Sequence, residues 1–417
     1  MIALIDINNF YVSCERLFNP HLINQPVVVL SNNDGCIISR SNEAKKLGIK
    51  MGIPLFKIKK FLHENKVNIL SSNYPLYADM SFRTMQVLSS FADLQEIYSI
   101  DECFLDLSGQ KNLNAVGRLI RKRLSRWLGM PVCVGIAPTK TLAKFANHCA
   151  KTQANWQGVC DFSKMKENEI NQIMANVDVS KVWGVGAKTS AKLKKMGINS
   201  VLDLKLTNPA KINFYFNVNI ERIVVELNQS ICFPIITEAP KKKEILSSRS
   251  FGRPVNTIEM LSEAITTFLS RATYKARQQE MLATSITLFI RSSPHKGKDN
   301  YYAKAIRISL DFPTNHHNLM LPRALEGLRT IFKPNIKYIK CGVSLSGLIS
   351  ESIQQKNLWP DVGNSSMEVV DKINNKFNKK SVRLGTEPLN PEWQMRQLNK
   401  SRSFTTSWDE LLIAQLN

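Results

Sequence analysis

The chain carries its clearest local signal in the stretch Tyr98-Ser99-Ile100-Asp101-Glu102-Cys103-Phe104-Leu105-Asp106, where two adjacent carboxylates separate two β-rich runs. Neighbouring side chains of a regular strand point to opposite faces, so both acids converge only if the chain turns between the runs. The stretch therefore predicts a hairpin whose strands, residues 97–100 and 103–107, meet at a tight acidic turn.

A third acid, Asp6, ends an apolar run that begins at residue 2. If this run is a strand beside the hairpin, Asp6, Asp101 and Glu102 meet at one edge of a sheet. Three anions share a small site only when cations neutralise them, and hard oxygen ligands favour Mg²⁺, for which Mn²⁺ can substitute. Two such ions would suit phosphoryl or nucleotidyl transfer. The spacing alone also fits a surface turn with two solvated acids and an unrelated Asp6.

Aromatic and basic residues accompany the acids. Tyr11, which follows Phe10, could lie under the sugar of a metal-held nucleotide and collide with a 2′-hydroxyl, although a core aromatic is the simpler interpretation. Arg40, Lys45 and Lys46 fall around a predicted helix start, and Lys151 follows another predicted helix. Cations from separate segments suit a triphosphate, but a solvated helix face fits them equally well.

Composition limits the class of protein. A chain of 417 residues predicts three or four domains. Its net charge of +22 and its pI of about 9.7 favour a polyanionic partner, nucleic acid before an anionic membrane. The N-terminal apolar run is too short for a signal peptide or an anchor and no segment reads as a membrane span, so we expect a cytoplasmic protein. The eight scattered cysteines form no C-x-x-C and are expected to be reduced thiols.

The N-terminal part predicts a mixed α+β fold, and the next part predicts helices. Residues 1–165 alternate strand candidates (2–6, 27–30, 36–39, 132–136) with helix candidates (42–47, 113–127, 139–150), which indicates a sheet with helices on one face. Residues 166–235 look all-helical and contain Val182-Trp183-Gly184-Val185-Gly186. A G-x-G turn between helices can offer backbone N–H groups to a phosphate, or it is an ordinary helix–helix turn.

The C-terminal part begins with a basic linker, residues 236–246. Residues 241–350 hold 18 Lys or Arg against 7 Asp or Glu, which is half of the whole chain's excess. Helix candidates (257–279, 319–332) and strand candidates (285–291, 305–311, 338–346) predict a small basic α+β unit that tracks a phosphate backbone. Residues 351–417 lose periodicity and predict an extended tail with local docking segments.

Several motifs in this order resemble the Y family of DNA polymerases, and most closely its UmuC-type branch, the catalytic subunits of bacterial DNA polymerase V. The resemblance runs essentially from residue 1 to the C-terminus. The motifs are Asp6 with Phe10-Tyr11, Ser31-Asn32-Asn33-Asp34-Gly35-Cys36, Glu43-Ala44-Lys45-Lys46-Leu47-Gly48, Tyr98-Ser99-Ile100-Asp101-Glu102, Ala137-Pro138-Thr139-Lys140-Thr141-Leu142-Ala143-Lys144, Val182-Trp183-Gly184-Val185-Gly186 and Ser248-Arg249-Ser250-Phe251-Gly252.

The resemblance implies a right-hand α+β polymerase. Palm and fingers would occupy 1–165, with the fingers at about 11–77. A helical thumb with a helix-hairpin-helix would span 166–235, and a linker 236–246. A DNA-binding little finger would span 247–348, and a C-terminal tail with a clamp-binding motif 349–417.

The resemblance also implies roles for single residues. Asp6, Asp101, Glu102 and the backbone carbonyl of Ile7 would hold the two metal ions, and Tyr11 would be the steric gate. The incoming nucleotide would touch Phe10, Ser39, Lys45 and Lys151, although Asn42 and Lys45 stand where many members carry Tyr and Arg. Other expected contacts are with DNA (Gly184, Gly186, Lys188, Arg249, Arg253) and with a sliding clamp (Gln355, Leu358, Trp359).

The expected activity is template-directed, error-prone translesion DNA synthesis without proofreading, in SOS-type damage tolerance. Expected partners are primer–template DNA, deoxynucleoside triphosphates, a sliding clamp, a processed UmuD-type dimer and a recombinase filament, in the bacterial cytoplasm at the nucleoid. One rival is a catalytically silent DNA-binding scaffold, which would not need all three acids. Another is a cyclase on a similar palm, which would not need the helical hairpin or the basic C-terminal unit.

Overall fold

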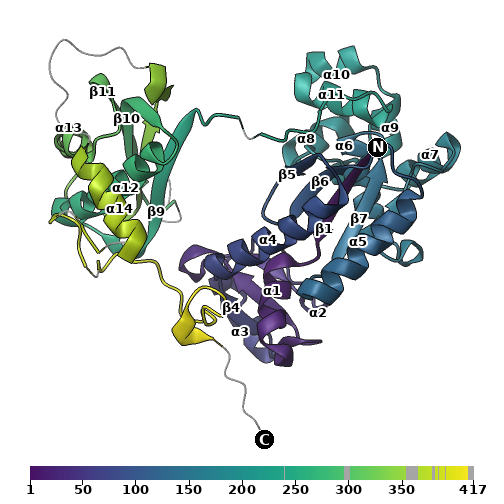
Figure 1. Cartoon of the computed structure of the whole chain (residues 1–417), viewed down its shortest axis with the longest axis horizontal. Helices are drawn as coiled ribbons and strands as arrows, with labels where there is room; N and C mark the ends of the chain where they lie inside the picture. Colours follow the sequence, from purple (N-terminus) through teal and green to yellow (C-terminus); the bar gives the residue numbers. More distant parts are fainter. Residues whose placement is uncertain are drawn as a thin grey trace, which may run out of the picture. The chain divides into compact units, whose positions relative to one another are not determined.

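The computed structural model describes residues 1–238, 240–294, 301–353, 365–377, 381–383, 385–389 and 391–411. It divides into two units, which we describe separately. Unit 1 comprises Met1–Ser31, Gly35–Ala239 and Asn399–Asn417, and unit 2 comprises Asn32–Asp34 and Pro240–Leu398. Both units contain helices and sheets (Figure 1), which confirms the predicted mixed α+β class.

The main sheet of unit 1 has five strands in the order β5-β6-β1-β7-β8. Its strands are β1 (Ile2–Ile7), β5 (Gln95–Ile97), β6 (Glu102–Asp106), β7 (Val132–Ala137) and β8 (Val159–Asp161). The central strand β1 runs antiparallel to both β6 and β7. The predicted hairpin is present, but its first strand ends at Ile97 because the N–H groups of Tyr98 and Ser99 both donate to the carbonyl of Glu102 and close the turn early.

Helices cover both faces of this sheet, so the expectation of helices on one face was wrong. Every residue of β1 is buried. Leu4 packs in a core with α6 (Lys140–Thr152), whereas Ile5 packs in a second core with α1 (Phe10–Phe18), α4 (Tyr74–Leu88) and α5 (Leu113–Leu128). A strand that is apolar at both alternating sets of positions buries both of its faces.

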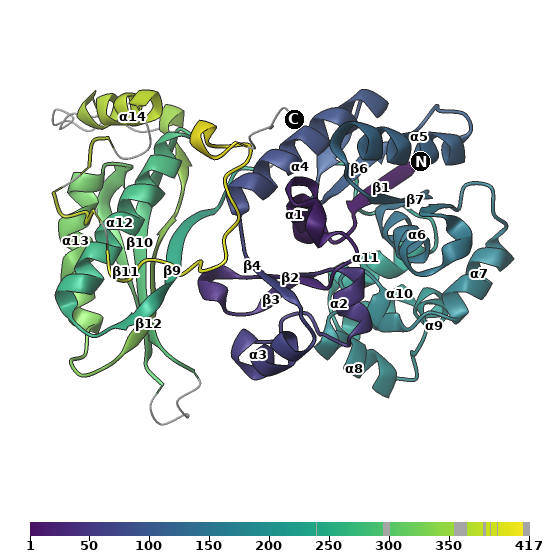
Figure 2. The same cartoon turned by 90° about the horizontal axis from the view of Figure 1, so that it is seen from below.

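A second, three-stranded sheet of unit 1 has the order β3-β2-β4. It comprises β2 (Val27–Leu30), β3 (Ile37–Arg40) and β4 (Asn68–Ser71), with α2 (Asn42–Lys46) and α3 (Leu55–Glu64) beside it (Figure 2). Its core is small and apolar and includes Val28, Ile37 and Leu62. Strand β4 pairs only with β2 among the described strands, so one of its edges is open to another segment.

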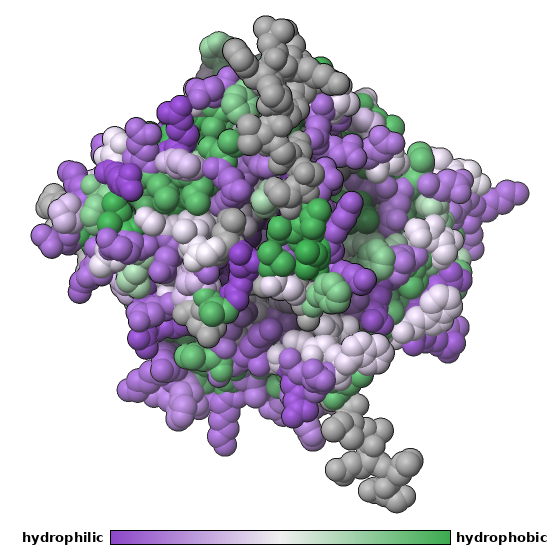
Figure 3. Space-filling view, turned by 60° about the vertical axis from the view of Figure 1, so that its left-hand side comes forward, coloured by the Kyte–Doolittle hydropathy of each residue, from purple (hydrophilic) through white to green (hydrophobic). Residues whose placement is uncertain are grey.

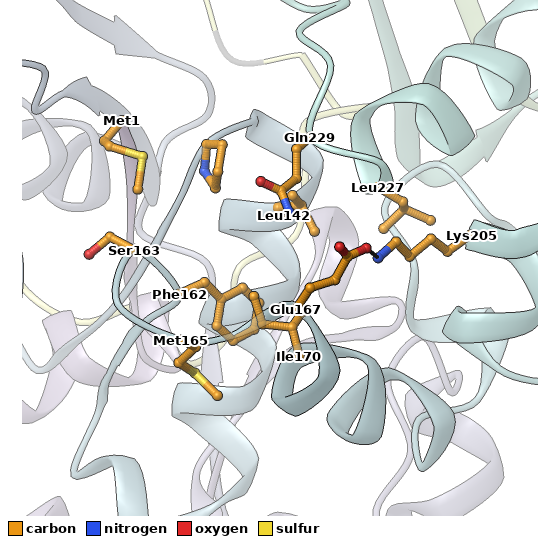
Figure 4. A pocket seen from close by; sticks show the side chains of 11 residues that line it. Met1, Leu142, Phe162, Ser163, Met165, Glu167, Ile170, Lys205, Leu227 and Gln229 are labelled. Carbon is orange, nitrogen blue, oxygen red and sulfur yellow. Dashed lines mark hydrogen bonds and ion pairs between the residues drawn. The ribbon is translucent and has the colours of Figure 1, made fainter.

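The helical part of unit 1 comprises α7 (Glu167–Ala175), α8 (Ala187–Lys195), α9 (Val201–Leu206), α10 (Pro209–Tyr215) and α11 (Val218–Leu227). It contacts α6, which packs on the main sheet, through buried polar groups: Glu226 accepts hydrogen bonds from the backbone N–H and the hydroxyl of Thr141. A small cavity of about 110 Å³ lies nearby. Figure 4 shows that its lining includes apolar side chains and the ion pair of Lys205 with Glu167, at 2.7 Å. We assign it no function.

Unit 2 contains a four-stranded sheet in the order β11-β10-β12-β9, with two long helices against it (Figure 1). The elements are β9 (Glu244–Val255), α12 (Ile258–Arg277), β10 (Met281–Ser292), β11 (Ala303–Thr314), α13 (His317–Ile331) and β12 (Tyr338–Ser346). A short strand, β13 (Ile349–Ser350), pairs with β10. Strand β9 begins inside the segment predicted as a linker, because its partner β12 and the burial of Ile245 favour the extended conformation.

The C-terminal segment is more ordered than the lost periodicity predicted. It contains a helix, α14 (Ser365–Phe377), on unit 2. Trp393 is 4% exposed and packs against Phe251 and Phe268 in the core of unit 2. A Cβ on Gly252 would lie 2.2 Å from the carbonyl oxygen of Gln394, so only glycine permits this approach. Residues from Asn399 onward belong to unit 1.

Candidate active site

The three predicted acids lie at one end of the main sheet. Asp6 is the register partner of Glu102 on the neighbouring antiparallel strand, which places the two side chains on the same face. The N–H of Ile7 donates to the carbonyl of Asp101 at 2.9 Å, and the hydroxyl of Ser99 donates to the Asp101 carboxylate at 2.7 Å. The turn between β5 and β6 thus holds Asp101 beside the end of β1.

Two lysines of α6 form ion pairs with two of these three acids. The Nζ atom of Lys151 lies 2.5 Å from the Asp6 carboxylate, and the Nζ atom of Lys144 lies 3.0 Å from both carboxylate oxygens of Glu102. Sequence reasoning expected Lys151 near a triphosphate and assigned no role to Lys144. Residues seven apart share one face of a helix, so the spacing indicated that the two lysines point the same way but not that they face carboxylates.

Lys144 also lies against two aromatic rings. Its Nζ atom is 4.5 Å from the ring centroid of Tyr98 and 5.3 Å from that of Trp183, which precedes Gly184 in the G-x-G turn. The Nε1–H of Trp183 donates to the Tyr98 hydroxyl at 3.2 Å. Cation–π attraction therefore helps to hold this ammonium group beside Glu102.

The electrostatics show that the three carboxylates interact. Burial raises the pKa of Asp6 to about 6; the Lys151 ammonium opposes this rise, and the charges of Glu102 and Asp101 add to it. As they stand, no three His, Cys, Asp or Glu side chains of the described residues lie close enough together to bind a metal ion. The oxygen-only donor set nonetheless fits Mg²⁺ or Mn²⁺ chemically, provided that the two ammonium groups move aside.

A cavity of about 360 Å³ opens beside the acids. Tyr11 lines it and is half-buried, and its ring stacks on that of Tyr77 with centroids 4.4 Å apart. The other lining residues include Asp6, Ile7, Asn9, Phe10, Ser39, Arg40, Lys45, Asp101 and Lys151. The structure therefore brings together the predicted metal, gate and nucleotide residues, except Glu102, whose carboxylate faces Lys144.

Cations from separate elements meet in this cavity. Lys45, on α2, donates to the Asn9 side chain at 2.6 Å. Burial lowers the pKa of Lys45, and the positive charges of Arg40 and Lys151 lower it further. The repulsion among Arg40, Lys45 and Lys151 would be relieved by a polyanion, so the cavity is suited to bind one. Asn9, which has a left-handed backbone with φ of 49°, was missed because a single Asn carries no periodic signal.

The predicted DNA contacts lie on exposed surfaces. Gly186 caps the N-terminus of α8, Lys188 is exposed in its first turn, and Gly184 has a φ of 79°. Arg249 and Arg253 are exposed on β9. Hydrophilic residues cover much of the face drawn in Figure 3. The predicted clamp motif, Gln355 to Trp359, lies outside the described residues.

Comparison with protein families then gave four matches along the chain. Residues 5–148 match the impB/mucB/samB family, and residues 242–358 match the C-terminal domain of that family. Residues 167–198 match its HHH motif, and residues 366–414 match a domain of unknown function, DUF4113. Protein UmuC of Salmonella typhimurium is 40% identical over 421 residues, which cover 99% of each chain. The chain belongs to the impB/mucB/samB family of Y-family DNA polymerases.

More distant members of the Y family agree with this placement. DNA polymerase IV 1 of Bacillus subtilis is 26% identical over 298 residues, which cover 70% of each chain. A Y-family polymerase chimera of Dbh and Dpo4 superimposes with a TM-score of 0.66 at 22% identity, over 84% of this chain and all of that chain. This superposition confirms the fold. No helix of the described ranges is long and apolar enough to span a membrane.

Proposed function

We propose that this Y-family polymerase performs error-prone translesion DNA synthesis without proofreading, by two-metal nucleotidyl transfer, in SOS-type damage tolerance. One observation carries the proposal: Asp6 and Asp101 line a cavity together with Tyr11 and three cationic side chains, and Glu102 is the register partner of Asp6 on the neighbouring strand. Acids for metal ions, an aromatic for a sugar and cations for phosphates are the parts that nucleotidyl transfer requires.

In this proposal Asp6, Asp101, Glu102 and the carbonyl of Ile7 hold two Mg²⁺ ions, which Mn²⁺ could replace. When bound, the two ions would acidify the primer 3′-hydroxyl and neutralise the triphosphate. For the ions to bind, the ammonium group of Lys144 must leave the Glu102 carboxylate and that of Lys151 must leave the Asp6 carboxylate. Lys151 would then contact the triphosphate.

The remaining cavity residues position the nucleotide. Lys45 and Ser39 contact the triphosphate of the incoming deoxynucleotide, and Phe10 and Tyr11 lie under its sugar. A ring there leaves no room for a 2′-hydroxyl, so the chain would discriminate against ribonucleotides by steric exclusion. The protein contributes position and charge more than acid–base groups.

Primer–template DNA would be held through its phosphates. The N–H groups of the turn at Gly184 and Gly186, with Lys188, would bind one part of the duplex, and Arg249 and Arg253 on β9 would bind another. Such contacts carry no base information, so a distorted or damaged template would be tolerated.

The family membership supports further partners. We propose a sliding clamp that binds Gln355, Leu358 and Trp359, a processed UmuD-type dimer and a recombinase filament. The site of action would be the bacterial cytoplasm at the nucleoid.

Primer extension with Mg²⁺ on undamaged and abasic templates tests the proposal, with the accessory dimer and the filament supplied. Wild type should extend the primer, and Asp101→Ala should lose extension while it keeps DNA affinity. Asp79→Ala is the matched control, because Asp79 pairs with Arg83 at the surface of α4. If no protein extends the primer although all of them bind DNA, the scaffold alternative becomes the better account. Tyr11→Ala should admit ribonucleotides.

A further inference from the structure

The C-terminal segment Asn399–Phe404 docks on unit 1 through residues distant in the sequence. Its residue Ser401 accepts a hydrogen bond from Asn73, which precedes it by 328 positions. The segment lies within the DUF4113 match, to which neither the match nor the proposed chemistry assigns a role. Its contacts fall on β4, on the start of α4 and on α1, the helix that carries Tyr11.

Buried polar groups of unit 1 find their partners in this segment. Ser71 and Asn73 are both fully buried. The N–H of Ser71 donates to the Asn399 carbonyl at 2.9 Å, and the N–H of Asn399 donates back to the Ser71 hydroxyl at 3.0 Å. The Asn73 amide donates to the Ser401 hydroxyl at 2.9 Å and to the Arg402 carbonyl at 3.1 Å. A buried polar group without a partner is unfavourable, so Ser71 and Asn73 require the hydrogen bonds that the segment Asn399–Phe404 supplies.

The same segment contacts a buried acid on α1. Glu15 is 1% exposed, and one of its carboxylate oxygens accepts hydrogen bonds from the Ser401 hydroxyl at 3.1 Å and from the Tyr77 hydroxyl at 2.7 Å. At the end of α1, the ring of Phe404 stacks on that of Phe18, with centroids 5.0 Å apart and planes 7° apart. One polar contact and one apolar contact thus fix the segment to α1.

Tyr77 connects the contact between this segment and α1 to the active-site cavity. Its hydroxyl is held by Glu15, and its fully buried ring stacks on the ring of Tyr11 at 4.4 Å and 15°. The direct contacts therefore run from Ser401 to Glu15, from Glu15 to Tyr77, and from Tyr77 to Tyr11. A movement of the Glu15 carboxylate would change the support on which the Tyr11 ring rests.

We propose that the segment Asn399–Phe404 is a built-in part of the palm and fingers that positions the Tyr11 ring through Glu15 and Tyr77, and that it thereby helps to set the preference for deoxyribose over ribose. This inference rests on the proposed role of Tyr11 as the gate. Ser401 and Phe404 are positioning residues, since neither touches the cavity. The DUF4113 region thus acquires a role in substrate selection.

The test uses the full chain and two independent measurements. The first is the ratio of kcat/KM for a deoxynucleotide to that for the matching ribonucleotide, in Ser401→Ala, Phe404→Ala and the double variant. This ratio is insensitive to the fraction of active protein, so a merely structural loss would not change it. The second is hydrogen exchange of the amides of α1 and of the first turn of α4. Ser403→Ala is the matched control, because the hydrogen bonds of Ser403 within the described residues use only its backbone.

We expect each single variant to lower the sugar ratio by about threefold to tenfold, the range that the loss of one interaction to a positioning group allows. Exchange at Glu15 and Tyr77 should rise in parallel, and Ser403→Ala should match wild type in both measurements. An unchanged ratio in the double variant, in an assay where Tyr11→Ala loses selectivity, would overturn the inference and leave the proposed function intact. If Tyr11→Ala keeps the preference for deoxyribose, Tyr11 is not the steric gate, and both that proposed role and this inference are wrong.

Discussion

Removal of Lys144 should make the acidic site bind divalent cations more tightly in the absence of DNA. Lys144 donates to both carboxylate oxygens of Glu102 at 3.0 Å, and the two side chains are only 15% and 19% exposed. A metal ion can reach Glu102 only after this pair separates. Lys144→Met keeps the length and the apolar stem of the side chain and removes the competing charge.

The size of the effect follows from the pair that must break. A hydrogen bond to a charged group contributes about 1.5–3 kcal/mol, which corresponds to roughly 10- to 150-fold in affinity. Because both side chains keep some solvent contact and the ammonium retains its attraction to Tyr98 and Trp183, the lower end applies, about tenfold.

Mn²⁺ titration followed by electron paramagnetic resonance measures this directly, because only the free ion gives the strong signal. Lys122→Met is the matched control, since Lys122 is exposed on α5 and the substitution changes the net charge equally. Glu102→Ala identifies the fraction of bound Mn²⁺ that belongs to the site. An affinity in Lys144→Met that equals or falls below that of wild type would refute the idea that Lys144 competes with metal for Glu102.

Two further predictions concern unit 2. Trp393→Ala should cost about 3–5 kcal/mol of its stability, since the side chain is 4% exposed against Phe251 and Phe268; calorimetry should show a lower melting transition for unit 2. Burial lowers the pKa of His317 from 6.5 to about 4, so its contribution to stability is full above pH 6.5 and is lost as the pH falls toward 4, on the order of 3 kcal/mol in total. In melting curves across this range, His317→Leu should lose less stability than wild type, and equal losses would contradict this assignment.

The elements with strong local patterns were predictable from the sequence. The acidic turn at Asp101 and Glu102 follows from two β-rich runs with adjacent carboxylates between them, and the structure has a hairpin there. The pairing that sets Asp6 opposite Glu102 spans almost a hundred residues and was only a condition in the prediction from the residues, because no local rule fixes a long-range strand pairing. The resemblance implied the shared metal site. Strand β9 was missed for a related reason. Its sequence is charged and contains Gly252 and Pro254, and it is extended only because β12 pairs with it.

The contacts of Lys144 and Ser401 mark the limit of sequence reasoning. A lysine on an amphipathic helix is usually solvated, and only the fold shows that this one faces a carboxylate. A serine in an aperiodic tail carries no signal at all. Its role depends on the buried partners Glu15 and Asn73, which lie more than 300 positions away. Such residues become visible only when buried polar groups are followed to their partners.

Trp393 and Ser401, the two anchors that fix the C-terminal segment to unit 2 and unit 1, also determine how the predicted clamp motif must be tested. Leu358 and Trp359 precede Trp393 and Ser401, so a chain that ends after residue 353 would lose a core tryptophan from unit 2 and the acceptors of Asn73 from unit 1. It would lose activity for reasons unrelated to a sliding clamp. The double substitution Leu358→Ala, Trp359→Ala keeps both anchors, and it should abolish stimulation by the clamp while distributive synthesis continues at the wild-type rate. Equal loss of both activities would show that the motif acts in folding rather than in clamp binding.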